Sequence, residues 1–195
     1  MAPAHYNLEL KARDRSHKAH VLLYYAGYEM APVEQYVALA VIAGVLAQMG
    51  AIAVLNESAH TALPASVLSV EEVDGDILDL LRALPLPMLY CGFVKFHNED
   101  GNGVWMRTYG AEELGLPDLA ACTKGDHEAT RYFSIFDNVL NYLLDSGARL
   151  SAGHTMQIDE DEYLRFNESG PRDPFDEGDG KLLITEVISR DEINR

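Results

Sequence analysis

The chain has 195 residues and a formal net charge of −16, from 31 Asp and Glu against 15 Lys and Arg. A chain of this length is expected to form a single domain over 1–195 and to bury about 70% of its unfolded surface. The acidic excess argues against nucleic acid as a partner, because phosphate contacts need clustered cations. A basic protein partner is compatible with the charge, although solubility alone also accounts for it.

Nothing in the sequence indicates a membrane partner or export. Residues 1–6 lack the charged-then-apolar pattern of a signal peptide, and the longest apolar segment, 37–49, is shorter than the ~20 residues that a spanning helix needs. The cytoplasm is therefore the predicted location. Cys91 and Cys122 show no CxxC spacing, so two reduced core residues are favoured over the alternative, a bridge between them.

The first half of the chain is predicted to contain a βαβ unit. Residues 6–12 alternate as an edge strand does, and the apolar run 20–25 is typical of a strand buried on both faces. Helical spacing then covers 32–49, in a stretch so apolar all round that we expect it to be covered on most sides. Residues 51–55 follow as a second buried strand and complete the unit, with a right-handed crossover.

The loop 56–64 comes directly off the end of that second strand. Ligands of open α/β sheets bind at the carboxyl ends of parallel strands, which makes Glu57 and His60 candidate binding residues. The alternative is a capping loop, in which Ser58 or Thr61 caps the next helix. Capping is the commoner use of such residues, and it is the favoured interpretation.

Further along, the sequence predicts short helices at 65–70 and 77–84 and then a hairpin. Its strands are 88–96 and 104–109, and the loop 97–103 between them contains both an Asp-Gly and an Asn-Gly pair. These pairs favour the left-handed backbone that hairpin turns need. The hairpin is the strongest local signal in the chain.

Alternation along 104–109 places Trp105, Arg107 and Tyr109 on one face of the second hairpin strand. Two aromatic rings that flank an arginine can form a cation–π surface suited to a ligand or a partner. Alternatively the rings pack under a helix while Arg107 reaches a carboxylate at the rim, and this interpretation is favoured because aromatic residues in strands are mostly core.

The remaining predicted elements are, in chain order, a helical turn at 111–114, a strand at 117–123, a long amphipathic helix at 126–145, a strand at 153–158 and a closing strand at 181–188. His154 lies at the start of the strand 153–158. Residues 167–180, with two prolines and three glycines, indicate an acidic irregular excursion. Calcium binding there is an alternative, but no EF-hand spacing supports it; its ligands would be Asp173, Asp176, Glu177 and Asp179.

No Walker loop, dinucleotide-binding GxGxxG, GxSxG elbow, HExxH or paired CxxC occurs in the sequence. The seven histidines form no close ligand pair, so no metal and no cofactor is expected. An acid–base group could arise only if the loops meet; its candidates are Glu57, His60, His127 and His154. The fold class that follows is α+β, with mixed sheets, a βαβ N-terminal half and a hairpin-plus-long-helix C-terminal half.

Three blocks of sequence carry a resemblance to a known family. They are 55–64, the stretch 104–110 with 114–117, and Ser146-Gly147 followed by 153–155. In this order they resemble the signature blocks of the domain of unknown function 4261 family (DUF4261), over about 20–165 and without the acidic 167–180. The resemblance implies no reaction, cofactor or catalytic set. It adds weight to the 56–64 loop, the 105–110 block and His154.

The leading functional hypothesis is a non-catalytic protein-interaction module, such as a bacterial immunity or accessory protein that masks a basic partner. The alternative is a small-molecule enzyme or sensor, with a pocket formed by the 56–64 loop, Arg107, Tyr109 and His154. A structural domain normally fused to others is a third possibility, and the sequence leaves the oligomeric state open. The candidate binding residues are Glu57, His60, Trp105, Arg107, Tyr109 and His154.

Overall fold

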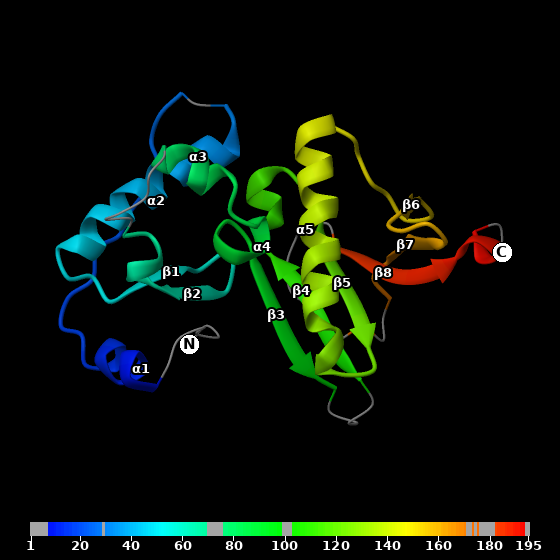
Figure 1. Cartoon of the computed structure of the whole chain (residues 1–195), viewed down its shortest axis with the longest axis horizontal. Helices are drawn as coiled ribbons and strands as arrows, with labels where there is room; N and C mark the ends of the chain where they lie inside the picture. The colour runs from blue at the N-terminus through cyan, green and yellow to red at the C-terminus, as the bar shows by residue number, and fades with distance from the viewer. Residues whose placement is uncertain are drawn as a thin grey trace. The chain divides into compact units, whose positions relative to one another are not determined.

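The computed structural model describes residues 8–28, 30–69, 76–98, 103–170, 173, 175 and 182–193. The chain divides into two compact units, Met1–Gly92 and Phe93–Arg195, here called unit 1 and unit 2. Both contain helices and strands (Figure 1), which confirms the α+β class. The expectation of a single domain over 1–195 stays a prediction. In the described part of the chain no helix is long and apolar enough to cross a membrane.

Unit 1 is mostly helical and holds one small sheet. Its elements are α1 (Leu8–Arg15), α2 (Pro32–Gln48), β1 (Ala53–Asn56), β2 (Thr61–Pro64), η1 (Ala65–Val67), α3 (Ile77–Arg82) and α4 (Leu86–Leu89). β1 and β2 pair antiparallel, with Asn56 opposite Thr61. Helix α2 packs on η1 and α3. Asp76 caps α3, because its carboxylate accepts the Leu78 N–H at 2.9 Å.

The predicted βαβ unit is wrong. Residues 20–25 form no strand among the described residues, and Val21 and Leu22 are exposed. The strand after α2 pairs with β2 and not with an earlier strand. An apolar run indicates that a segment is suited to burial, but it does not indicate which strand it pairs with. The predicted edge strand at 6–12 is also wrong, because α1 occupies Leu8–Arg15. That stretch consists largely of strong helix formers, whose propensity outweighs a brief alternation.

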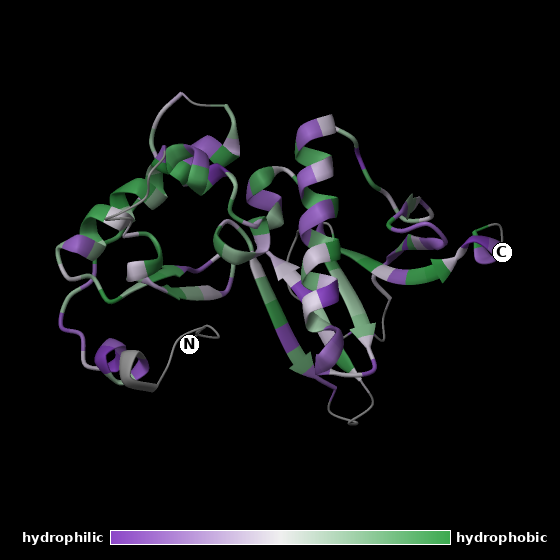
Figure 2. Cartoon of the chain, viewed as in Figure 1, coloured by the Kyte–Doolittle hydropathy of each residue, from purple (hydrophilic) through white to green (hydrophobic). Residues whose placement is uncertain are grey.

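Helix α2 was predicted correctly in extent but not in its surroundings. Pro32 lies in its first turn, where a proline fits, and Met49 ends it. One side is buried against η1, and a Cβ on Gly44 would lie 2.4 Å from the Leu68 carbonyl oxygen, so the contact requires glycine. The opposite side, with Ile42 and Val45, is exposed. Figure 2 shows much of this helix in the hydrophobic colour, with some hydrophilic bands, so part of its apolar surface is exposed.

Unit 2 is a mixed sheet with one long helix. Its elements are β3 (Gly92–His97, whose first residue closes unit 1), β4 (Val104–Tyr109), η2 (Ala111–Leu114), β5 (Asp118–Thr123), η3 (Asp126–Glu128), α5 (Ala129–Ser146), β6 (Thr155–Gln157), β7 (Glu162–Glu168), β8 (Leu182–Ser189) and η4 (Arg190–Glu192). The six strands lie in the order β3-β4-β5-β8-β7-β6. β5 and β8 run parallel, whereas β4–β5, β7–β8 and β6–β7 are antiparallel.

Helix α5 covers one face of this sheet (Figure 1). Its 3.6-residue apolar stripe is buried, as predicted, and Gly147 ends it with a φ of 66°. Phe93 of β3 meets Phe133 and Phe136 edge to face, with ring centroids 5.4 and 6.1 Å apart. The hairpin-plus-long-helix half is therefore confirmed, and its core lies between α5 and the sheet.

Three details of the predicted layout are corrected. Residues 88–90 do not begin a strand, because the prolines at 85 and 87 favour the first turn of α4. β7 was missed, since its alternating Leu164 and Phe166 follow an acidic run that masks them. Cys91 is buried but Cys122 is exposed, and neither sulfur is part of a disulfide among the described residues, so only Cys91 is a core residue.

Candidate functional site

The face of β4 that points away from α5 carries an aromatic cluster. Alternation on the strand places Trp105, Arg107 and Tyr109 together there, while Met106 lies on the other face and is fully buried. Phe175 joins them from the chain between β7 and β8, with its ring 5.0 Å from Trp105 and 5.1 Å from Phe96 of β3. We call the rings of Phe96, Trp105, Tyr109 and Phe175 the β4 aromatic cluster.

Arg107 is the one charged side chain on β4, and it is buried inside this cluster with 6% of its surface exposed. Its Cζ lies 4.1 Å from the centroid of the Tyr109 ring and 4.8 Å from that of Phe175. Its buried Nε has no hydrogen-bond partner among the described residues. Cation–π contacts stabilise a guanidinium by about 0.5–2 kcal/mol, less than the several kcal/mol that its desolvation costs. An acceptor for Nε–H would offset that difference.

Asp118, at the start of β5, is a buried carboxylate that the charge of Arg107 affects. Its Oδ1 accepts hydrogen bonds from Thr108 Oγ1 at 2.9 Å and from the Ala111 N–H at 3.2 Å. Burial raises its pKa, and those two bonds and the Arg107 charge oppose the rise. The carboxyl group is thus committed to Thr108 and Ala111. Within the described chain Arg107 forms no ion pair with it or with another carboxylate.

The Gly110 turn explains how this carboxyl group is held. Gly110 has a φ of 81°, a left-handed conformation that glycine adopts without strain, and it redirects the chain at the end of β4. As a result the Ala111 N–H faces back toward Asp118. Thr108 Oγ1 also accepts the Leu119 N–H at 2.8 Å, which joins the ends of β4 and β5. The network fixes the strand that presents Arg107.

The structure therefore brings together three of the six candidate residues, namely Trp105, Arg107 and Tyr109. Neither sequence-based interpretation describes their surroundings fully. The rings do not pack under a helix, because α5 lies on the other face, and Arg107 reaches no carboxylate among the described residues. Phe96 could have been found from the alternation of β3. Phe175 follows no pattern in the sequence, because its contact is made across about 70 residues of chain.

His154 belongs to unit 2 but lies at its other end. It is exposed just before β6, and its carbonyl oxygen accepts the Phe166 N–H of β7 at 3.0 Å. β7 and β4 are three strand spacings apart in the sheet, about 14 Å at the usual separation. The His154 backbone is thus held far from the β4 aromatic cluster.

Glu57 and His60 lie in unit 1, in the turn between β1 and β2. Both are exposed, and the His60 N–H donates to the Glu57 carbonyl oxygen at 3.1 Å. His60 has a φ of 51°, a left-handed backbone that is uncommon without glycine. The Asn56 side chain accepts the Ala59 N–H at 3.3 Å, so the loop 56–64 is a hairpin turn and not a cap of the next helix.

Other polar groupings lie on the surface of each unit. Asp126, at the start of η3, pairs with Lys95 and His97 of β3 at 3.3 and 3.5 Å. In the described part of the chain no three His, Cys, Asp or Glu side chains are grouped so as to hold a metal ion. Of the carboxylates considered for calcium, only Asp173 is described, and its side chain accepts the Gly170 N–H. Asp176, Glu177 and Asp179 lie outside the described residues.

Comparison with known proteins gives one match. A family model described as Domain of unknown function (DUF4261) matches residues 107–180, from the middle of β4 to the acidic stretch before β8. The family resemblance is confirmed, but its expected extent is corrected: the match starts at Arg107 and includes 167–180, which had been placed outside it. Neither the curated proteins nor the solved structures contain a match.

Proposed function

We propose that unit 2 binds an organic carboxylate at Arg107. The premise is that the chain belongs to the DUF4261 family through residues 107–180, and this family is defined without a function. The observation that carries this proposal is the buried Nε of Arg107, which has no partner among the described residues. A buried polar group without a partner is rare, because leaving it unsatisfied costs about 1–3 kcal/mol or more. A ligand oxygen would satisfy it.

The geometry of arginine favours an oxyanion as that ligand. The guanidinium presents its N–H groups in a planar fork, which matches the two oxygens of a carboxylate. The rings of Tyr109 and Phe175 lie over the guanidinium and do not accept its Nε–H, which has no acceptor among the described residues. In surroundings of low dielectric such a charge-assisted bond is stronger than it is in water. Arg107 would supply most of the affinity.

The surroundings of Arg107 favour a monoanion with an apolar body. The four rings of the β4 aromatic cluster offer apolar contact next to the charge. The net charge of −16 repels anions at long range, and it repels a doubly charged phosphate more than a single carboxylate. Benzoate combines one carboxylate with an aromatic ring, and it is therefore the probe that best matches the site.

Binding is favoured over covalent catalysis at this face. Cys122 of β5 lies opposite Trp105 in the strand register and carries a side chain that can act as a nucleophile. Although the residue is exposed overall, partial desolvation of its thiol, with a smaller contribution from the Asp173 charge, raises the thiol pKa. A raised pKa keeps the group in the thiol form at neutral pH, and the thiolate is the nucleophile. The proposed function is accordingly that of a binding domain or sensor.

Fluorescence of the chain's single tryptophan tests the proposal, because Trp105 touches Phe175, which stacks on Arg107. Titration with benzoate is expected to give a saturable change, with acetate weaker for want of a ring and phosphate weaker still. Arg107→Lys should reduce the affinity by about 10-fold or more, because lysine lacks the planar fork. The matched control Arg149→Gln changes an exposed arginine and should bind as the natural chain does.

Two results would contradict the proposal. One is a benzoate titration that leaves Trp105 fluorescence unchanged up to millimolar concentrations. The other is binding that Arg107→Lys and Arg149→Gln weaken equally, since general charge and not the fork would then account for it. Equal affinity for acetate and benzoate would remove the argued contribution of the rings.

A second candidate function is the protein-interaction module that masks a basic partner, as an immunity or accessory protein does. The turn between β6 and β7 supports it, because Asp159, Glu160 and Asp161 are all exposed there and add to the net charge of −16. Pull-down from the native host at low and high salt tests this candidate. We expect a basic protein to be retained at low salt and released at high salt, and no retention at low salt would exclude it.

A further inference from the structure

Helix α2 of unit 1 has two apolar sides, and the described residues pack against only one of them. Its inner side, which includes Val37 and Gly44, is buried. Its outer side carries an exposed stripe, defined as Ala38, Ile42, Val45 and the helix-ending Met49. The last three side chains are 51%, 52% and 78% exposed. Burying apolar surface stabilises a protein, so the outer stripe is a strong candidate for contact with another surface.

The spacing of the outer stripe is that of a helix–helix seam. Its four residues follow one another at intervals of four, three and four, which is the a/d spacing of two helices that pack along their length. From residue 35 to residue 49 the helix contains no charged residue. Glu34 at its start is paired with Arg82 of α3 at 2.7 Å. A second helix with the same spacing would meet only apolar side chains.

The sizes of the side chains fit a second copy of α2, and we propose that the outer stripe joins two copies of the chain. In an antiparallel pair with two-fold symmetry, position 38 lies opposite 49, and 42 lies opposite 45. The smallest side chain, Ala38, then faces the largest, Met49, and Ile42 faces Val45. A parallel pair would place Met49 against Met49 and Ala38 against Ala38, which leaves a gap at one end.

Charge also favours a second copy over a basic partner. Two copies that each carry −16 repel one another, and a surface without charge adds least to that repulsion; the outer stripe is such a surface. A basic protein would find no carboxylate along it. The proposed contact is therefore a homodimer seam that is independent of the carboxylate site on β4.

Sedimentation equilibrium of the full chain tests the seam. The natural chain is expected to form a dimer, and Ile42→Glu should weaken it by about 100-fold or more, because each copy would bury a carboxylate in an apolar contact. The control is Leu55→Glu on β1, which alters a side chain 54% exposed and outside the stripe. It should leave the dimer unchanged. Circular dichroism checks that both variants keep the fold.

A designed charge pair tests whether the two helices run antiparallel. Ile42→Glu combined with Val45→Lys should restore the dimer, because each introduced carboxylate faces an introduced ammonium across an antiparallel seam. A natural chain that is monomeric at all concentrations would overturn the proposal, as would a dimer that Ile42→Glu leaves intact. A monomer whose thermal midpoint falls with Ile42→Glu would also overturn it, since the chain's own residues would then cover the stripe.

Discussion

The two units bury their apolar residues in different ways. In unit 2 a sheet offers a broad face that the single stripe of α5 closes, so Phe136 and Leu164 are fully buried. In unit 1 the sheet has two short strands. The described residues around α2 cover only some of its apolar side chains. An amphipathic helix completes a core by itself, whereas a helix that is apolar all round needs a partner on each side.

The largest expected effect tests the closed core of unit 2. Phe136→Ala removes a fully buried ring that contacts Phe93 and Tyr132, with centroids 6.1 and 5.7 Å away. We expect it to lower the free energy of unfolding by about 3–5 kcal/mol, from lost transfer energy and the cavity that remains. Tyr142→Ala on the exposed side of α5 should change it by less than about 0.5 kcal/mol. Urea unfolding measures both, and similar losses would contradict a core closed by α5.

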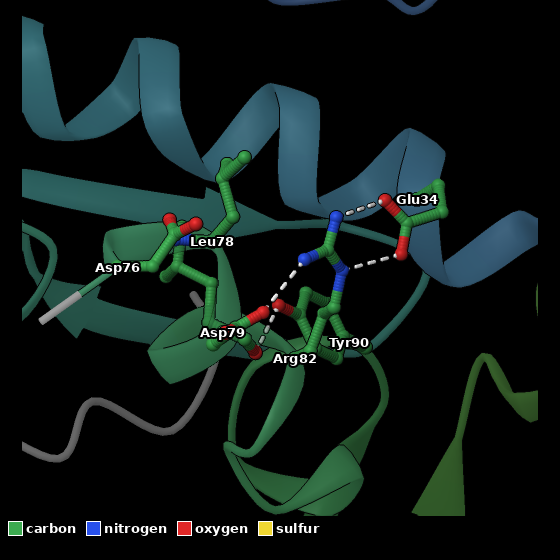
Figure 3. Close-up of polar contacts among 7 residues, drawn as sticks. Glu34, Asp76, Leu78, Asp79, Arg82 and Tyr90 are labelled. Atoms are coloured by element: carbon green, nitrogen blue, oxygen red, sulfur yellow. Dashed lines mark hydrogen bonds and ion pairs between the residues drawn. The ribbon is translucent and has the colours of Figure 1, made fainter.

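An intermediate effect tests the packed side of unit 1. Tyr90 is buried against Tyr36, and its Oη donates to the Leu81 carbonyl oxygen at 2.6 Å (Figure 3). Tyr90→Phe removes that bond and should cost about 0.5–1.5 kcal/mol at pH 8. Met88→Leu, two residues earlier in the chain, conserves volume and serves as a control with a smaller cost.

The same residue gives a prediction for alkaline pH. Burial, with a smaller contribution from the Glu34 charge, raises the pKa of Tyr90 from its ordinary value of 10.0 to about 12. The folded chain then keeps a proton that the unfolded chain loses, so this residue's contribution to stability falls as pH rises above 10. Urea midpoints between pH 8 and 11 should therefore fall more for the natural chain than for Tyr90→Phe. A constant difference would contradict the raised pKa.

The smallest effect concerns the ion pair that ties α2 to α3. Figure 3 shows the Arg82 guanidinium pointing at Glu34, with Nε and Nη2 donating to its two oxygens at 2.7 and 2.9 Å. The hydrogen bonds from Arg82 lower the pKa of Glu34, so the pair contributes above the ordinary pKa of 4.5 and is lost as pH falls below it. Both side chains are partly exposed, so Glu34→Gln should lower the thermal midpoint only slightly.

Salt distinguishes this pair from the packing around it. The difference between Glu34→Gln and the natural chain should shrink in about 1 M salt, because screening weakens exposed charges. Glu57→Gln, in the exposed turn of unit 1, is the control and should not shift the midpoint. A salt-independent loss for Glu34→Gln would indicate that the side chain acts by packing.

Local periodicity was sufficient to predict β4 and α5 of unit 2. The alternation of β4 places Arg107 and its neighbours on one face, and the stripe of α5 follows its 3.6-residue spacing. Gly110 and Gly147 end their elements with the left-handed backbone that glycine favours. These features depend on residues close together in the chain, so the sequence carries them.

Contacts between distant segments could not be predicted in the same way. Residues 20–25 have the composition of a buried strand, but pairing needs a neighbour, and no strand forms there among the described residues. Phe175 lies in an acidic stretch without periodicity, yet its ring covers Arg107. The sequence thus predicted the arginine and two of its aromatic neighbours, and the missing acceptor for Nε–H emerged only from the packing.

The NMR signal of the Arg107 Nε–H tests the proposed carboxylate site most directly. Burial of this atom should slow its exchange with water and make the proton observable, and its assignment follows from its loss in Arg107→Lys. Benzoate should move the resonance downfield with the same saturation as Trp105 fluorescence, because the N–H then donates to a carboxylate. A resonance that stays in place while benzoate is added would contradict the assignment of Arg107 as the carboxylate-binding residue.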